Sequence, residues 1–304
     1  MKNKFLSPRT AQEIDDRVAK ILKELGNPEP PLRLEEVRDL LSLDLAYYSS
    51  TDNGILKEVV HRLMVAGKQV VLRPSLLIDV VTKFDLRALF LPDRKRILID
   101  STQPPIKHRW YIGHEIIHSI VPWHSSLMLG DTRHTLTPSC HDQIEAESNY
   151  GAGSLLFLLD EFADRARDTR ATINSIKGLN NIFGNTITNT LWHYIEQSHE
   201  ILFGLVTVHP HILPLDFNPK DPCKYFIRSK PFELQFPGVT EVELFKIIAR
   251  YCTRSRGGPL GEDEAVLHDL NGTDHIFRFE TFYTRYEALT LGVHEKMKHL
   301  AISA

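Results

Sequence analysis

Two histidines one helical turn apart, with a glutamate directly after the first, are the residues of this chain best suited to chemistry. They are His114, Glu115 and His118, in the segment HRWYIGHEIIHSIV. Side chains four positions apart lie on one face of a helix, so His114 and His118 can bind the same metal ion. Glu115 leaves the helix beside that ion, where a carboxylate can take a proton from an activated water. The alternative is a pair of ordinary histidines on a surface or core helix.

A catalytic zinc site of this H-E-x-x-H type needs a third protein ligand and leaves a fourth position for water. The next helix is expected to begin near Asp142, which forms a capping box with Glu145. Glu147 follows one turn before Gly151, whose lack of a side chain would let this helix approach the histidine helix closely. Glu147 is therefore predicted as the third ligand. Glu145 is the rival, although its place suits a charge near a helix N-terminus.

The segment between these two helices, 123–141, is rich in histidine. His124, His134 and His141 could each bind the metal or orient a ligand, but the loop-like sequence favours solvated side chains. A donor that stabilises the oxyanion is also expected. Four side chains are open candidates for it: Tyr111, His134, His141 and Tyr150.

Strand and helix patterns before the motif predict a scaffold that can position it. Segments 87–91 and 96–100 indicate a hairpin or a pair of edge strands, with the turn at residues 92–95, which begins Pro-Asp. A helix is expected at 104–121, capped by Ser101 or Thr102. Helices are also expected at 9–25, 32–41 and 55–65, and strands at 43–48 and 69–72.

The histidine motif and the segment EAESNYGAGSLL, residues 145–156, together resemble the ImmA/IrrE family of zinc metallopeptidases. In that family an H-E-x-x-H helix is followed by an E-A-N-x-F-A-x-x-L-L-M-P helix. The resemblance extends over residues 9–200. This chain departs from the family pattern at Gly151, Ser154 and Leu158.

The resemblance implies a zinc endopeptidase in which His114, His118 and Glu147 hold Zn²⁺ and Glu115 is the catalytic base. It also implies a protein substrate, typically a helix-turn-helix repressor whose cleavage derepresses stress or mobile-element genes. A different class of function remains open, namely a regulatory binding protein that keeps a structural or vestigial zinc site and acts through its C-terminal domain. The presence of Glu115 argues against that alternative, because a purely structural site does not need it.

We expect an α+β fold with three parts: a helical, zincin-like metallopeptidase core with a small sheet at 1–158, a helix-turn-helix-like segment at 159–200, and an α+β domain at 201–304. The C-terminal domain is expected because strands at 201–208, 225–227 and 275–283 surround a helix at 241–250. By family analogy alone it would be a sensor or a substrate-docking module.

Charge and composition limit the partners and the location. The net charge is −3 and residues 186–197, the would-be recognition helix, contain no Lys or Arg, so direct DNA binding is not expected. No apolar stretch is long enough to span a membrane, and the N-terminus lacks the apolar segment of a secretory signal. The three cysteines lack C-x-x-C spacing, which is typical of reduced thiols. These features predict a cytoplasmic protein.

Overall fold

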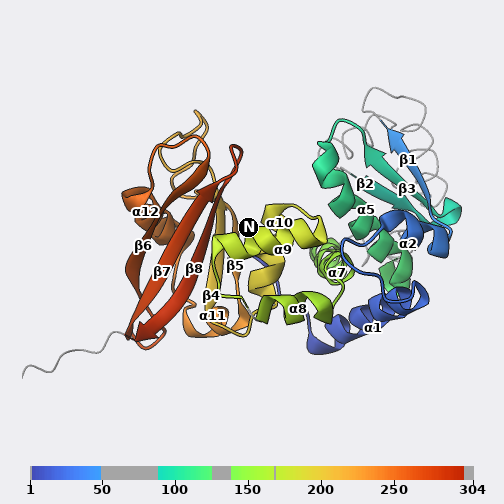
Figure 1. Ribbon diagram of the computed structural model, residues 1–304, viewed down its shortest axis with the longest axis horizontal. Helices are drawn as coiled ribbons and strands as arrows, with labels where there is room; N and C mark the ends of the chain where they lie inside the picture. Colours follow the sequence, from blue (N-terminus) through green and yellow to red (C-terminus); the bar gives the residue numbers. More distant parts are fainter. Residues whose placement is uncertain (1, 49–87, 125–137, 168, 298–304) are drawn as a thin grey trace, which may run out of the picture. The chain divides into compact units, whose positions relative to one another are not determined.

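The computed structural model describes residues 2–48, 88–124, 138–167 and 169–297 (Figure 1). Within them the chain forms helices and two separate sheets, so the predicted α+β class is confirmed. The chain divides into two compact units. The first is Leu6–Glu161 with Phe183–Asn185, and the second is Met1–Phe5, Phe162–Ile182 and Thr186–Ala304. The helical segment expected at 159–200 thus groups mainly with the C-terminal unit.

The first unit contains a three-stranded sheet of order β1-β3-β2. The central strand β3 pairs in parallel with β1 and antiparallel with β2, and a 3-10 turn, η1, connects β2 to β3. The predicted hairpin is therefore confirmed. The helix expected at 55–65 and the strand at 69–72 lie outside the described residues. The observed elements are α1 (Pro8–Glu24), α2 (Leu34–Leu41), β1 (Asp44–Tyr48), β2 (Ala88–Leu91), η1 (Pro92–Arg94) and β3 (Arg96–Asp100).

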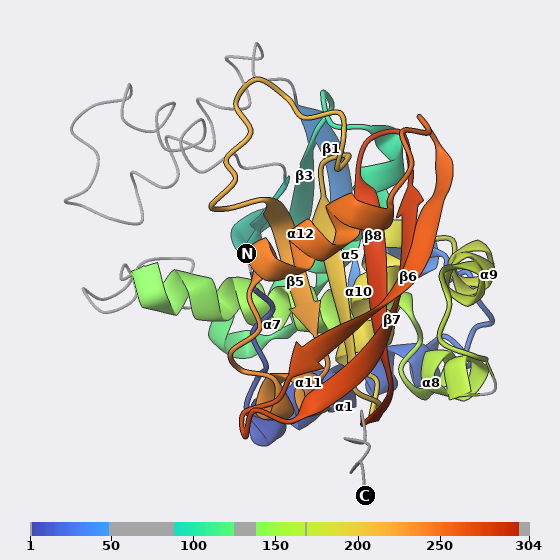
Figure 2. The same cartoon turned by 90° about the vertical axis from the view of Figure 1, so that its left-hand side faces the viewer.

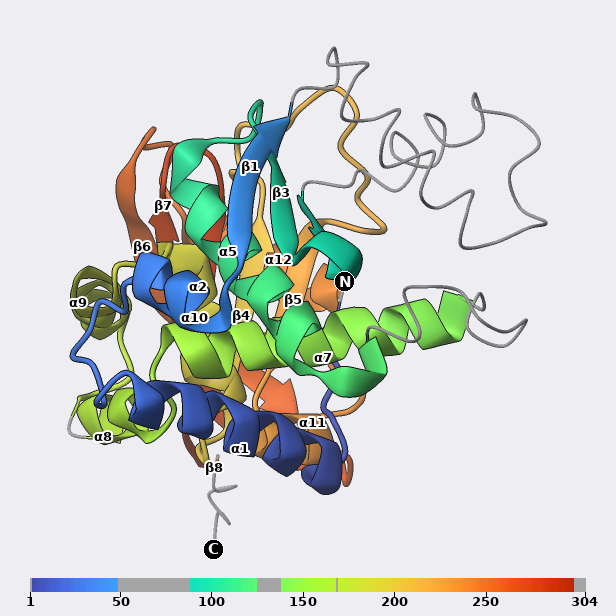
Figure 3. The ribbon, with the colours of Figure 1, turned by 90° about the vertical axis from the view of Figure 1, so that its right-hand side faces the viewer.

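Two helices of the first unit carry the candidate site, α5 (Pro105–Ile120) and α7 (Pro138–Leu156). Helix α7 lies between α1 and α5 (Figure 3). A Cβ atom on Gly151 would lie 2.8 Å from Cγ2 of Ile117 on α5 and 2.9 Å from Cγ2 of Ile14 on α1. Only a residue without a side chain permits this approach, so the predicted role of Gly151 is confirmed.

Helix α5 begins at Pro105, within one residue of the predicted start, but its predicted cap is wrong, and so is the predicted start of α7. Helix α5 has Pro104 as its N-cap residue, and neither Ser101 nor Thr102 caps it; the Thr102 hydroxyl instead donates to Asp100 at 2.8 Å. Helix α7 begins at Pro138 rather than near Asp142. In both helices a proline occupies the first turn, where its missing N–H costs no hydrogen bond and its fixed φ suits the helix.

The second unit is built on a five-stranded antiparallel sheet of order β5-β4-β8-β7-β6 (Figure 2). Helices α11 and α12 cover one face, where phenylalanine rings such as Phe203 and Phe277 form the core. Helix α10 packs on the other face against β4 and β5. The elements are α9 (Ile173–Phe183), α10 (Ile187–Glu196), β4 (Leu202–Thr207), β5 (Cys223–Arg228), α11 (Lys230–Gln235), α12 (Glu241–Tyr251), β6 (Gly258–His268), β7 (Asp274–Tyr283) and β8 (Ala288–Met297), preceded by α8 (Asp160–Arg167). None of the helices described in either unit is long and apolar enough to cross a membrane.

Candidate metal centre

His114 and His118 project from α5 toward a common point. Their Nε2 atoms lie 3.1 Å apart. The carboxylate of Glu145, on α7, is 3.2 Å from Nε2 of His114 and 3.7 Å from Nε2 of His118. His114, Glu115 and His118 also offer ligand atoms that all lie within 4.8 Å of one another. This group could hold a metal ion.

The other ring nitrogen of each histidine is held by α7. Nδ1 of His114 lies 3.1 Å from Oδ1 of Asn149, and Nδ1 of His118 lies 3.1 Å from Oγ of Ser148. An amide oxygen only accepts, so Nδ1 of His114 donates in this contact, which leaves Nε2 as the ring nitrogen that a metal ion would bind. Hydrogen bonds of this kind orient metal-binding histidines in proteins.

The charges around His114 favour a cation. Burial acts to lower the pKa of His114, but the hydrogen bond that its ring donates to the Glu145 carboxylate and the negative charge of Glu115 outweigh it, so the pKa is raised. Two imidazole nitrogens and a carboxylate oxygen that converge on one point can share a ring proton or bind a metal ion between them. The donor set therefore fits a bound metal ion.

Glu115 lies next to this point in an apolar setting. Its side chain is buried, and burial raises its pKa to about 7, against the opposing effects of His114 and of a hydrogen bond from the backbone of Phe90 on β2. A carboxylate whose pKa is near neutrality can both accept and release a proton under physiological conditions. Strand β2 thus contributes to the site through its backbone.

Glu147, the predicted third ligand, directs its carboxylate to other partners. Its Oε2 accepts from Nε1 of Trp123 at 2.6 Å and lies 2.9 Å from Nε2 of His124, and its Oε1 accepts from Gln143 at 2.7 Å. Burial acts to raise its pKa, but these hydrogen bonds outweigh burial and lower it. The structure therefore brings Glu145, and not Glu147, to the imidazole pair.

His124 connects Glu147 to the histidine pair. Besides its contact with Glu147, its Nδ1 lies 3.4 Å from Oγ of Ser148, which in turn contacts His118. His124 is fully buried, so its interpretation as a solvated loop histidine is wrong. The sequence gives one clue to the burial of His124, because this residue follows Trp123 shortly after the apolar end of α5.

The four oxyanion candidates are placed unequally. The hydroxyl of Tyr150 donates to Asp15 on α1 at 2.6 Å, and that of Tyr111 donates to Gln103 at 3.4 Å. His134 and the side chain of His141 lie outside the part of the chain that the structure describes.

Ser154, one of the departures from the family pattern, also donates to Asp15, at 2.7 Å, so it joins α7 to α1.

Comparisons with known proteins bear on the fold. No family model matches the chain, and no curated protein does. Among solved structures, a transcriptional regulator of Mycobacterium tuberculosis is similar, with a TM-score of 0.50 over 96% of this chain and 92% of that chain, at 13% sequence identity. At this identity the similarity shows a shared fold and nothing about activity.

Proposed function

We propose that this chain is a zinc-dependent endopeptidase of the ImmA/IrrE type. The observation that supports this most is the paired arrangement of His114 and His118, whose Nε2 atoms lie 3.1 Å apart while α7 holds both Nδ1 atoms. Two imidazole nitrogens and one carboxylate oxygen, with a position left for water, are the ligands of catalytic zinc in many peptidases. In our proposal Glu145 supplies that oxygen, because its carboxylate is 3.2 Å from Nε2 of His114.

Glu115 acts as the general base in this proposal. Zinc bound between the histidines would polarise the peptide carbonyl and acidify a water molecule. Glu115 takes a proton from the attacking water and delivers it to the nitrogen of the departing amine. Its position suits both transfers, since the same carboxyl must be a base in the first step and an acid in the second, and it lies buried beside the two imidazoles.

The residues of α7 have positioning roles. Asn149 and Ser148 fix the ring planes of the two histidines, so the Nε2 lone pairs stay directed at the metal. The chain of contacts from Ser148 through His124 to Glu147 anchors this arrangement in the buried interior. The metal ligands are therefore preorganised by the packing of α5 against α7.

We propose a protein substrate, and specifically a cytoplasmic helix-turn-helix repressor, on the family resemblance of residues 114–118 and 145–156. The alternative is a regulatory binding protein that retains the metal site for structure and acts through its C-terminal unit. The two proposals differ in what they require of Glu115, because binding alone needs no general base.

The deciding experiment compares Glu115→Gln with the unaltered protein on candidate helix-turn-helix repressors, which would include any that is encoded beside this gene. We expect the variant to bind about one zinc per chain but to cleave at least about 100-fold more slowly, the typical contribution of a general base. The control is Glu29→Gln, which removes an exposed carboxylate of the same unit and should leave cleavage unchanged. Equal cleavage by Glu115→Gln would exclude the mechanism, and absence of cleavage by all three proteins would favour the binding alternative.

A further inference from the structure

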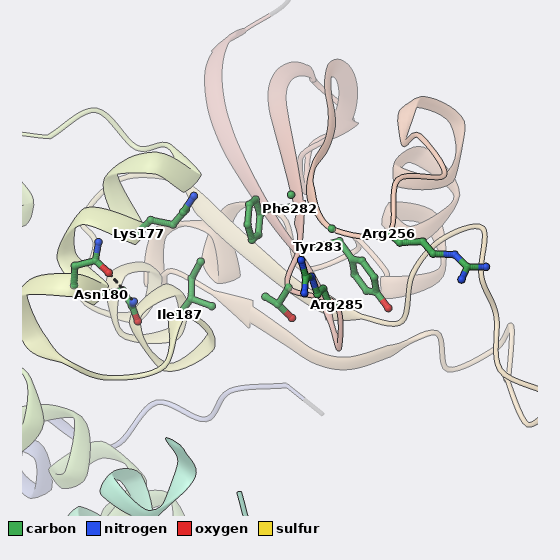
Figure 4. Close-up of a pocket in the computed structure, with 11 residues that line it drawn as sticks. Lys177, Asn180, Ile187, Arg256, Phe282, Tyr283 and Arg285 are labelled. Carbon is green, nitrogen blue, oxygen red and sulfur yellow. Dashed lines mark hydrogen bonds between the residues drawn. The ribbon is translucent and has the colours of Figure 1, made fainter. Parts of the chain in front are cut away.

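The second unit contains a cavity of about 600 Å³ that has no part in the proposed peptidase chemistry (Figure 4). It is formed by α9, the start of α10, the segment before β6, and the turn between β7 and β8. All of these elements belong to the second unit. This volume lies in the range of pockets that bind small organic molecules.

The charge of this cavity is one-sided. Lys177, Arg256 and Arg285 line it, and its lining contains no Asp or Glu. The chain as a whole has a net charge of −3, so a cavity lined by three basic side chains and no acidic one differs from the chain average. Among the described residues, none of these three has a carboxylate within ion-pair distance. Their charges are available to an anionic ligand.

Aromatic rings accompany the positive charges. Phe282 and Tyr283, at the end of β7, line the cavity, and Nζ of Lys177 lies 4.8 Å from the centroid of the Phe282 ring. Figure 4 shows Lys177 on α9 directed toward Phe282, with Tyr283 and Arg285 together beyond it, and Arg256 extending outward at the rim. Aromatic faces beside cationic groups suit a ligand that combines an anion with a flat ring.

The backbone holds Arg285 in an unfavourable conformation. Its φ is +80°, a left-handed value that long side chains seldom adopt, in the tight turn between β7 and β8. Its side chain lies over Gly257, where a Cβ atom would be 3.4 Å from Cγ of Arg285. Strained residues of this kind concentrate at ligand-binding sites.

We propose that this cavity binds a small phosphate monoester that carries a flat ring, the chemistry of a nucleoside monophosphate. Lys177 and Arg285 contact the phosphate, Arg256 adds attraction from the rim, and the ring lies against the aromatic side chains. A phosphate monoester carries nearly two negative charges at neutral pH and thus matches several basic groups better than a single carboxylate does. The proposal does not depend on the metal centre, which lies in the other unit.

Titration calorimetry on the full-length protein tests this with three probes: adenosine monophosphate, adenosine and inorganic phosphate. We expect the monophosphate to bind with a dissociation constant of about 1 mM or tighter, and each of the other two to bind at least about tenfold more weakly. Binding should weaken as salt is added, because screening reduces the attraction between exposed charges. Inorganic phosphate binding as tightly as the monophosphate would show that the ring plays no part and would overturn the proposed ligand class.

Variants assign the binding to the cavity. Lys177→Gln and Arg285→Asn should each weaken monophosphate binding about tenfold or more, since each removes one charged hydrogen-bond donor. Asn is chosen at 285 because it tolerates the left-handed backbone. Lys246→Gln, an exposed charge on α12 outside the cavity, is the matched control and should bind normally. The proposal is overturned if the monophosphate does not bind, or if both cavity variants bind it as well as the control, with unfolding temperatures confirming that all are folded.

Discussion

Replacing Glu145 and Glu147 separately by alanine should have opposite consequences for metal binding and for stability. Glu145 lies 3.2 Å and 3.7 Å from the two Nε2 atoms, and 41% of its side chain is exposed. Glu147 is 5% exposed, and its carboxylate is held by Trp123, His124 and Gln143. The first carboxylate is placed to bind a metal, and the second is placed to hold the interior of the first unit together.

The structure sets the size of each effect. Glu147→Ala removes the acceptor for the buried His124 and the partly buried Trp123. A buried donor costs about 1–3 kcal/mol when left unpaired, so we expect a loss of about 3 kcal/mol for the two together. In a unit of this size that loss lowers the unfolding temperature by about 6–12 °C. Glu145→Ala removes a half-exposed side chain and should change stability by no more than about 0.5 kcal/mol. It should weaken zinc binding by about 100-fold or more, since loss of an outer hydrogen bond alone costs 10–100-fold.

Two measurements separate the effects. Thermal unfolding is recorded in the presence of a chelator, so that bound metal does not stabilise the folded state. Zinc affinity is measured by competition with a coloured chelator, with Glu29→Ala as a control for loss of an exposed carboxylate in the same unit. We expect Glu145→Ala to lose more zinc affinity than Glu147→Ala, and Glu147→Ala to lose more stability. If Glu147→Ala keeps its metal-free stability and loses most of its zinc affinity, Glu147 is the ligand and our placement of the third ligand is refuted.

Three further predictions concern orientation, packing and pH. Ser148→Ala should weaken zinc binding about tenfold by releasing His118, as chelator competition would show, and should lower the metal-free stability by about 1–3 kcal/mol because it removes a hydrogen-bond partner of buried imidazole nitrogens. Gly151→Ala should lower the free energy of unfolding by about 1–3 kcal/mol in urea titrations, whereas Gly178→Ala, in open space on a helix, should raise it by up to about 1 kcal/mol. Burial raises the pKa of Glu196 to about 7 from 4.5, so the folded state keeps a proton that the unfolded state loses, and stability should fall as the pH rises from 4.5 to 7. The free energy of unfolding of Glu196→Gln should change over that window by up to about 3 kcal/mol less than that of the unaltered protein, as urea unfolding at each pH would show.

Much of the scaffold could be predicted because its patterns are local. The apolar run of β3, the Pro-Asp turn before it and the helix after it are each specified by a few neighbouring residues. The amphipathic pattern of α1 likewise gave its bounds to within one residue at each end. Gly151 was informative for a related reason, since a glycine inside a helix is costly unless something packs against it.

The sequence favoured Glu147 over Glu145, which we now propose as the third ligand, because the expected start of α7 was too late. With a start near Asp142, Glu145 would be in the first turn, where a carboxylate serves the helix end. The helix begins at Pro138, so Glu145 lies in its interior and needs another explanation. Glu145, Ser148 and Asn149 are spaced i, i+3 and i+4 and so share one helix face, whereas Glu147 faces elsewhere. That spacing was present in the sequence and would have favoured Glu145.

In the second unit, the sequence did not predict β6, β8 or α11. The two strands were missed for different physical reasons. Strand β6 includes the acidic run Glu262–Glu264 and lies at the edge of the sheet, where polar side chains are tolerated on exposed positions. Strand β8 contains Gly292, which is unfavourable in a strand unless a neighbour needs its space. That neighbour is Phe203, whose ring would lie 2.1 Å from a Cβ atom there, and only the folded sheet brings it close. Non-local packing of this kind leaves no pattern in nearby residues.

The interface between α5 and α7 makes sense only if it serves a purpose other than stability. His118, His124, Glu147 and Ser148 are all buried there, in positions where apolar side chains would pack at lower cost. Their hydrogen bonds satisfy one another, and the sequence of contacts ends at two imidazole Nε2 atoms that lie 3.1 Å apart beside the Glu145 carboxylate. A fold that only needed to be stable would not direct two acceptors and a carboxylate at one position. A cation at that position would be held by all three groups, and our proposal gives Glu115 beside it the proton transfer that a structural metal site would not require.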